Sequence, residues 1–230
     1  MSSPSAWFEA LPEPGELLSL GRAFLAAEAA YETHFGADLD VAASLTRLDD
    51  GVVELSFPRF EGDQLLFRFG PGWSMVVAYD HESGRDPWRH ELGTPTMWPG
   101  LAEGLPDHLL PWLKTPWDEE DVIVCTAIAW WLNEDPGWRG GRVGDVDGAV
   151  RVGEHDDGVG TLIEPFLSPA RMMAEIDAYL EPLVLGPDLF NALAGEAPLT
   201  ARQVQALGGS DVPKMTACLR HLGYQGDFET

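Results

Sequence analysis

Trp73-Ser-Met-Val-Val-Ala-Tyr79 opens a stretch that runs to Trp138 and contains eight of the nine tryptophans of this 230-residue chain. Six of the eighteen prolines also lie within it, between Pro87 and Pro116. A tryptophan is costly to leave exposed, and a proline removes a backbone hydrogen-bond donor. We therefore predict that residues 87–117, the Trp/Pro belt, form an irregular segment that large aromatic side chains fix to a core.

Apolar and polar residues alternate in four segments around the start of this stretch, as in strands whose side chains point to alternate faces. Turn-forming sequences separate the segments, including Asp49-Asp50-Gly51 and Gly70-Pro71-Gly72. The pattern predicts an antiparallel meander with one buried face, and Pro58 should mark a strand end, a bulge or an edge. The four predicted strands are Val41–Leu45, Val53–Phe57, Leu65–Phe69 and Trp73–Tyr79.

A helix is predicted before the sheet, because apolar residues recur at three- and four-residue steps from Glu16 to Phe35 and Gly36 follows as a typical helix end. This helix is expected to cover the buried face of the sheet. Ser168-Pro169 predicts another helix start. Short helices are predicted at residues 188–194, 200–207 and 212–222. We expect an α+β fold, with the β-meander in a domain of residues 1–185 and a small helical C-terminal segment, residues 186–230, packed on it.

The segment after the belt carries conflicting signals. Thr115-Pro116-Trp117-Asp118 is typical of a helix start, with Thr as the cap and Pro at the first position. The next residues are rich in β-branched side chains and lead to a turn at residues 134–137. We predict a buried strand at Val122–Leu132, paired across that turn with Trp138–Val146, and a helix is the alternative. Gly160–Phe166 is a further predicted strand.

The chain is strongly acidic: 38 Asp and Glu oppose 14 Lys and Arg, which gives a formal net charge of -24. Such a surface repels nucleic acid and anionic lipid, and it attracts basic partners at rates that depend on salt. The charge therefore argues against nucleic-acid and membrane binding and favours a basic protein partner. General solubility is the alternative explanation, because net charge says nothing about the fold.

The expected compartment is the cytoplasm. The N-terminal residues contain neither a basic region nor an apolar run long enough for a signal peptide or a membrane span. The two cysteines, Cys125 and Cys218, lie far apart in apolar surroundings, which is typical of buried free thiols in a reducing compartment.

Two polar segments are candidate partner-binding residues. The first is the loop after the strand that ends at Tyr79, where Asp80, His81 and Glu82 could be presented to a partner, together with Trp88 in the belt. The alternative is that Asp80 and His81 only satisfy backbone groups of a tight turn. The second is an acidic quartet, Asp118, Glu119, Glu120 and Asp121, which could form a helix N-terminus or an acidic lip for a basic partner.

Motifs for metal, cofactor or nucleophilic chemistry are weak. Ser83 follows His81 closely, but neighbours in sequence cannot all face one another, and no nucleophile-elbow motif surrounds Ser83. The remaining metal-ligand types, at His90, Glu91 and residues 155–157, have no specific spacing. We therefore expect no catalytic residues, no metal and no cofactor.

Three short strings carry a resemblance: Tyr79-Asp-His-Glu-Ser83, Trp98-Pro-Gly-Leu-Ala-Glu-Gly-Leu-Pro106 and Trp138-Arg-Gly-Gly141. Over residues 73–150 the chain resembles a group of actinobacterial proteins, some of which look like immunity proteins of polymorphic toxin systems. The resemblance implies a cytoplasmic α+β protein that binds and blocks a toxin and has no catalytic residues of its own. The alternative function is a small-molecule hydrolase that uses His81 with Asp80 or Glu82.

Overall fold

A computed structural model describes residues 7–36, 43–58, 62–83, 85–86, 97–118, 123–141, 159–181, 183–195 and 197–226. The chain forms two compact units, each built from two separated stretches. The sheet unit comprises Met1–Leu11 and Thr46–Ile163, and the helical unit comprises Pro12–Leu45 and Glu164–Thr230. This grouping differs from the single division expected after residue 185, because the opening helix joins the C-terminal helices.

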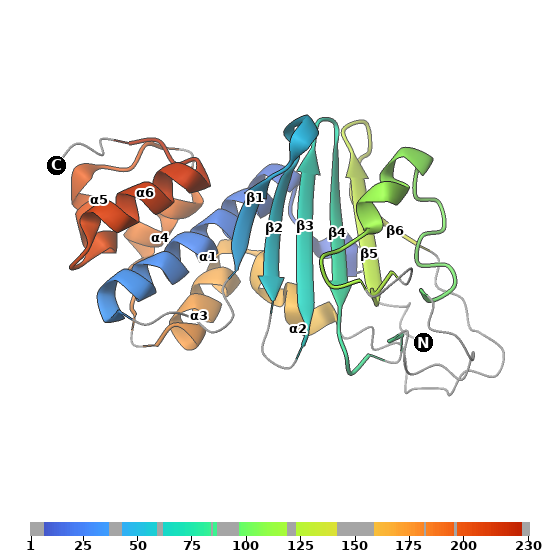
Figure 1. Ribbon diagram of the computed structural model, residues 1–230, viewed down its shortest axis with the longest axis horizontal. Coiled ribbons are helices and arrows are strands. Elements are labelled where there is room, and N and C mark those ends of the chain that lie inside the picture. Colours follow the sequence, from blue (N-terminus) through green and yellow to red (C-terminus); the bar gives the residue numbers. More distant parts are fainter. Residues whose placement is uncertain are drawn as a thin grey trace. The chain divides into compact units, whose positions relative to one another are not determined.

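Within the described residues, the sheet contains six strands in the order β1-β2-β3-β4-β5-β6, which is also their order in the chain (Figure 1). From β2 to β6, each strand pairs antiparallel with the next. The predicted α+β class and the antiparallel meander are thus confirmed. The strands are β1 (Ser44–Arg47), β2 (Val53–Pro58), β3 (Gln64–Gly70), β4 (Trp73–Tyr79), β5 (Ala127–Leu132) and β6 (Arg139–Gly140).

The turn between β3 and β4 fixes the register of the central hairpin. Gly70 pairs with Trp73, so Pro71 and Gly72 form a two-residue connection. Gly72 has a φ of 86°, the left-handed value that the third position of a type II turn requires after a proline. From this turn the pairing runs without interruption to Gln64 opposite Tyr79. Side chains at the open end of the hairpin are therefore placed by the turn sequence.

The belt covers one face of the sheet. Trp73, Met75 and Val77 of β4 point to this face and pack with belt residues, among them Leu101 and Leu109. The side chains on the opposite face of β3 and β4 are buried as well, and α2 (Val159–Ile163) contacts both strands. The expectation of one buried face was therefore wrong for the central strands, because the belt is a core layer of its own.

The tryptophans of this layer are core residues. Trp98 and Trp130 are buried in the same cluster as Trp73, and Trp112 and Trp117 pack against it while partly exposed. Trp130 is only 2% exposed, and its Nε1 donor has no hydrogen-bond partner among the described residues. The 3-10 helix η3 (Asp107–Leu113) supplies Leu109 and Leu113 to the cluster. The predicted irregular, aromatic-anchored belt is confirmed in its described part.

A buried ion pair lies under the belt on neighbouring strands. Glu54 of β2 is directly opposite Arg68 of β3. Arg68 Nε donates to Glu54 Oε2 at 2.7 Å, and the two side chains are only 7% and 11% exposed. A second guanidinium nitrogen donates to the Trp112 carbonyl oxygen, and the guanidinium lies over the Trp112 ring. Arg68 therefore joins the sheet to the belt, because it forms an ion pair with Glu54 on β2 and donates a hydrogen bond to the backbone of Trp112 in the belt.

At the far edge of the sheet, β5 begins at Ala127 and pairs antiparallel with β6, so the predicted strand pairing is confirmed for these residues. Residue 122 and residues 142–146 of the two predicted strands lie outside the described residues. Gly140 permits a close approach, since a Cβ there would lie 2.4 Å from the Phe8 ring of η1 (Trp7–Ala10). The strand predicted at Gly160–Phe166 was wrong: α2 and the 3-10 helix η4 (Glu164–Leu167) occupy these residues.

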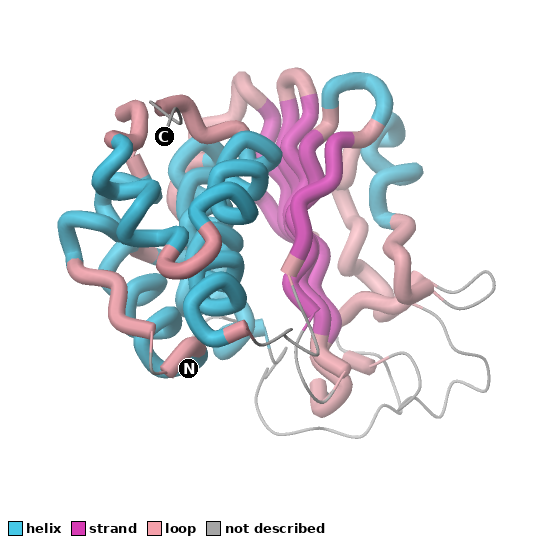
Figure 2. The backbone as a smooth tube through the Cα atoms, turned by 60° about the vertical axis from the view of Figure 1, so that its left-hand side comes forward, coloured by secondary structure: helices cyan, strands magenta, loops and turns pink. Residues whose placement is uncertain are grey.

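The helical unit consists of α1 packed with the C-terminal helices (Figure 2). α1 ends at Gly36 with a φ of 64°, as predicted, and its buried residues include Leu17, Leu20 and Phe24. Ser168 caps α3 by accepting a hydrogen bond from the Arg171 backbone N–H. The helices are α1 (Pro14–Phe35), α3 (Pro169–Tyr179), α4 (Pro187–Ala194), α5 (Ala201–Gly208) and α6 (Val212–Leu222), which confirms the predicted helices.

Both cysteines are free thiols. Burial raises the pKa of the Cys218 thiol to about 11 and also raises the pKa of Cys125. Among the described residues, no helix is both long and apolar enough to cross a membrane.

Candidate functional site

The open end of the β3–β4 hairpin brings two carboxylates together. Gln64 and Tyr79 are the last paired residues, so Asp63 and Asp80 occupy the next opposite positions. Like charges directly opposite across two strands repel each other. A positive charge at this end of the hairpin would therefore be stabilising.

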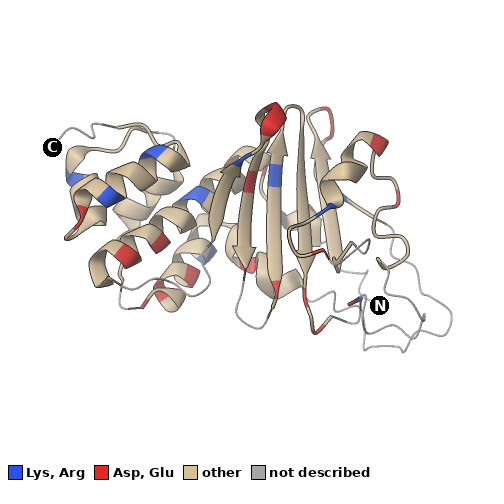
Figure 3. Cartoon of the chain, in the orientation of Figure 1, with Lys and Arg blue, Asp and Glu red and all other residues tan. Residues whose placement is uncertain are grey.

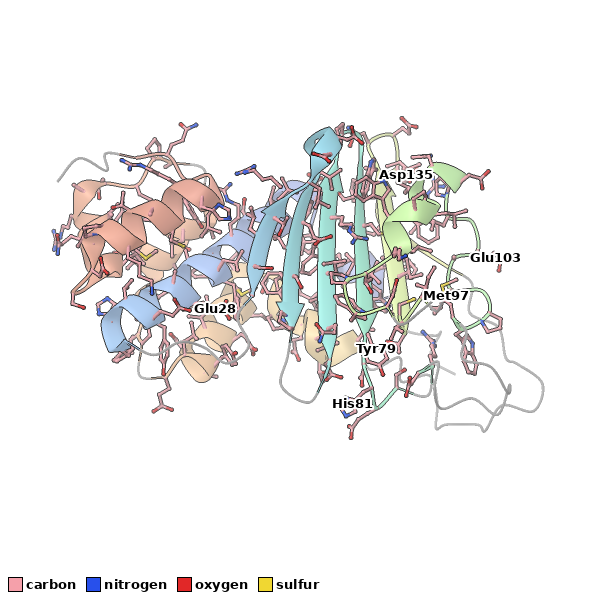
Figure 4. All side chains as sticks on the ribbon, in the orientation of Figure 1. Glu28, Tyr79, His81, Met97, Glu103 and Asp135 are labelled. Carbon is pink, nitrogen blue, oxygen red and sulfur yellow. The ribbon has the colours of Figure 1, made fainter. Side chains whose placement is uncertain are left out.

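His81 supplies one compensating contact. Its Nδ1 lies 2.7 Å from Asp63 Oδ1, and its backbone N–H donates to the same oxygen at 3.0 Å. The His81 side chain is 33% exposed and that of Asp63 is 21% exposed. Figure 4 shows His81 at the end of β4, just beyond Tyr79. His81 is thus held through Nδ1 and its own backbone.

Asp80 is the buried member of the group, with 8% exposure. Its backbone N–H donates to Thr126 Oγ1 at 3.1 Å, and its Oδ1 accepts from the Glu82 backbone N–H at 2.7 Å. Burial raises the pKa of the Asp80 carboxyl, the Glu82 N–H opposes this, and the charge of Asp63 raises it further. The loop after β4 therefore holds Asp80 in place, and burial there destabilises the ionised form of its carboxyl group.

The remaining loop residues do not form a nucleophilic triad. Ser83 is buried, and its Oγ accepts from the Arg85 backbone N–H at 3.1 Å. Within the described residues, no hydrogen bond joins Ser83 to His81. Glu82 is exposed at the turn. The alternative that Asp80 satisfies local backbone groups is confirmed for its bond to Glu82, while His81 is bonded to Asp63 across the hairpin.

Of the acidic quartet, only Asp118 lies among the described residues, and it has a structural role. Asp118 Oδ1 accepts from Thr115 Oγ1 at 2.7 Å and from the Val124 backbone N–H at 2.9 Å, while Oδ2 accepts from the Thr115 backbone N–H. Residues 115–118 form a turn that these bonds close, so the helix that was the alternative to the predicted strand does not begin at Thr115-Pro116. The other candidates, Trp88, Glu119, Glu120 and Asp121, lie outside the described residues, as do His90, Glu91 and residues 155–157.

Asp63 is the site residue that sequence reasoning missed. It precedes β3 and is seventeen positions from Asp80 in the chain. The sequence contains the information that places it. A two-residue turn at Pro71-Gly72 sets the register of the hairpin, and counting outward from this turn along both strands places Asp63 opposite Asp80. The oxygen and nitrogen ligand atoms of Asp63, Asp80 and His81 all lie within 4.8 Å of one another.

Comparison with known proteins gives no match: no family model, no curated protein and no solved structure matches this chain.

Asp63 is expected to control the titration of His81. The hydrogen bond to Asp63 raises the pKa of His81 above its ordinary value of 6.5. The contribution of this hydrogen bond to the stability of the folded protein is therefore complete below about pH 6.5. The contribution is lost as the pH rises through the pKa of His81 in the folded state. In metal-free buffer, Asp63→Asn should lower the His81 pKa, measured by NMR titration of the imidazole. An unchanged pKa would show that this hydrogen bond is absent in solution.

Proposed function

We propose that this chain is an acidic binding protein of the immunity type, which inhibits a basic protein toxin by covering its positive surface. The observation that carries the proposal is the distribution of charge. The stretches of the sheet unit contain 23 acidic and 9 basic residues, and those of the helical unit contain 15 and 5. Figure 3 marks acidic residues, in red, along the described backbone of both units. The acidic excess is thus spread over the stretches of both units and is not confined to an acidic tail.

The β3–β4 end is the proposed centre of contact in the sheet unit. Asp63 before β3 and Glu82 after β4 present carboxylates there, and the hairpin register, the His81 N–H and Asp80 hold the two segments in place. Lys or Arg side chains of a partner would relieve the repulsion between Asp63 and Asp80. Such contacts accelerate association and weaken as salt screens them.

Affinity capture from the native host at low and at raised salt tests the proposal. We expect a basic protein to be retained at low salt and released at raised salt, and the isolated protein to be a toxin whose activity the chain inhibits. Glu82→Lys should weaken binding by about tenfold or more, as expected for a reversed charge within an interface. Glu103→Lys is the matched control, since Glu103 is also exposed in the sheet unit.

Two outcomes would contradict this function. The first is that no protein is retained at low salt. The second is that Glu82→Lys and Glu103→Lys weaken binding equally, which would mean that only the total charge matters.

A hydrolase is the second candidate, and the hydrogen bond between Asp63 and His81 favours it. A carboxylate that binds Nδ1 orients an imidazole so that Nε2 can act as a general base towards water. Asp63 would take the orienting role, in place of Asp80 or Glu82. Ester and amide probes test this: activity that His81→Gln abolishes would support it, and wild-type protein without turnover would remove it.

A further inference from the structure

We propose that Asp63, Asp80 and His81 form a binding site for a divalent first-row transition metal, which joins the ends of β3 and β4. The proposal goes beyond the inhibitor function and does not depend on it. Sequence spacing alone predicted no metal site, because Asp63 is distant in the chain and only the hairpin register brings it to the other two residues.

The distances suit a shared ion. The candidate ligand atoms lie within 4.8 Å of one another, and His81 Nδ1 is 2.7 Å from Asp63 Oδ1. In a tetrahedral site, two atoms that bind one zinc ion at 2.0–2.2 Å lie about 3.3–3.6 Å apart. The widest pair must therefore approach by up to about 1.5 Å, which the partly exposed side chains of Asp63 and His81 can supply by rotation.

The charges of the site are incompletely compensated. Two carboxylates face each other across the strand ends, and one of them, Asp80, is more than nine-tenths buried. Buried carboxylates in proteins are paired with cations or coordinate metals. Among the described residues, no Lys or Arg pairs with Asp63 or Asp80, and His81 is the only ion-pair partner of Asp63. A divalent ion would supply the missing positive charge.

The ligands are positioned before an ion binds. The Glu82 N–H holds Asp80 Oδ1, and the Thr126 hydroxyl accepts from the Asp80 backbone. The His81 backbone N–H fixes Asp63 Oδ1. Outer hydrogen bonds of this kind orient metal ligands and strengthen binding. In the metal complex, the Nδ1 lone pair of His81 would bind the ion in place of the proton now shared with Asp63.

The donor set indicates the class of metal. One imidazole nitrogen with two carboxylates suits Zn²⁺, Mn²⁺ and similar ions, whereas Ca²⁺ and Mg²⁺ prefer sites made of oxygen ligands alone. Selectivity for Zn²⁺ over Ca²⁺ that depends on His81 is therefore the property that separates a metal site from general attraction of cations to an acidic surface.

Isothermal titration calorimetry of the full chain, freed of metal with EDTA, tests the proposal. We expect Zn²⁺ to bind with one equivalent per chain, and Asp63→Asn and His81→Gln each to weaken binding by at least about tenfold. Glu103→Gln and His108→Gln are matched controls, because these exposed side chains lie in the same unit outside the site. They should bind Zn²⁺ as the wild type does.

Asp80→Asn serves only as a supplementary variant, because Asp80 is buried and its replacement could impair folding. Far-UV circular dichroism establishes that the two principal variants are folded. The proposal is overturned if wild-type protein shows no saturable Zn²⁺ binding, if folded His81→Gln binds as tightly as wild type, or if Ca²⁺ competes equally with Zn²⁺. None of these results depends on a protein partner, so the inhibitor function is judged separately.

Discussion

Replacing Trp130 by Ala is expected to lower the free energy of unfolding of the sheet unit by about 3–5 kcal/mol. Trp130 is 2% exposed and lies in the cluster that joins the sheet to the belt. Truncation removes the apolar contacts of a large, almost fully buried side chain and leaves a cavity between β5 and the belt. Because the chain has two compact units, amide hydrogen exchange in β4 and β5 is the measurement of choice, since it reports on the sheet unit alone.

Trp130→Phe is the matched variant. It keeps most of the aromatic area and removes the Nε1 donor, which is buried and has no acceptor within the part of the chain that the structure describes. An unsatisfied buried donor costs about 1–3 kcal/mol, so its removal should offset much of the lost packing. We expect a net loss of about 1 kcal/mol or less. If Phe costs as much as Ala, the Nε1 donor has a partner in the folded protein.

Removing the charge of Glu54 is expected to cost about 3–5 kcal/mol, because Glu54→Leu leaves the buried guanidinium of Arg68 without its counter-ion. Leu can occupy the same position in β2, so the loss of stability arises from the unpaired charge of Arg68 and not from a change of the backbone. Urea unfolding of the sheet unit, followed by hydrogen exchange in β2 and β3, measures the effect.

The double variant Glu54→Leu/Arg68→Met measures the net contribution of the ion pair to stability, without the cost of leaving one charge buried and unpaired. Replacing both charges by apolar side chains is often neutral or stabilising, so this variant should be within about 1 kcal/mol of the wild type. The Trp112 carbonyl oxygen loses its donor in the double variant, which accounts for a small residual loss. The single variant Arg68→Met completes the cycle. If the loss in the double variant equals the sum of the losses in Glu54→Leu and Arg68→Met, then Glu54 and Arg68 are not coupled.

The local parts of the fold were predictable because short-range physics determines them. Gly36 ends α1 with a left-handed backbone, and Ser168 caps α3 with its side chain. The alternation of apolar residues located the strands from β2 to β4. The errors arose where contacts between residues far apart in the chain determine the secondary structure. The sequence of α2, Val-Gly-Thr-Leu-Ile, favours a strand, but these residues form a helix that packs on β3 and β4.

The candidate site was predictable only in part. The loop after β4 was identified from its sequence, but the residue that His81 binds comes from the start of β3. Asp118 shows the opposite error. Its position after Thr115-Pro116 favoured a helix N-terminus, whereas its two oxygens close a loop by accepting from Thr115 and Val124. A carboxylate can satisfy either arrangement, so local sequence does not distinguish them.

The division of the helical unit into two stretches has a consequence for synthesis on the ribosome. α1 is made early, but its packing partners, α3 to α6, follow only after the 118 residues from Thr46 to Ile163. At about 5–20 residues per second, this interval lasts roughly 6–24 s. During that time the apolar stripe of Leu17, Leu20 and Phe24 lacks its final partners. The nascent chain is therefore expected to need protection by chaperones until its last helix has emerged.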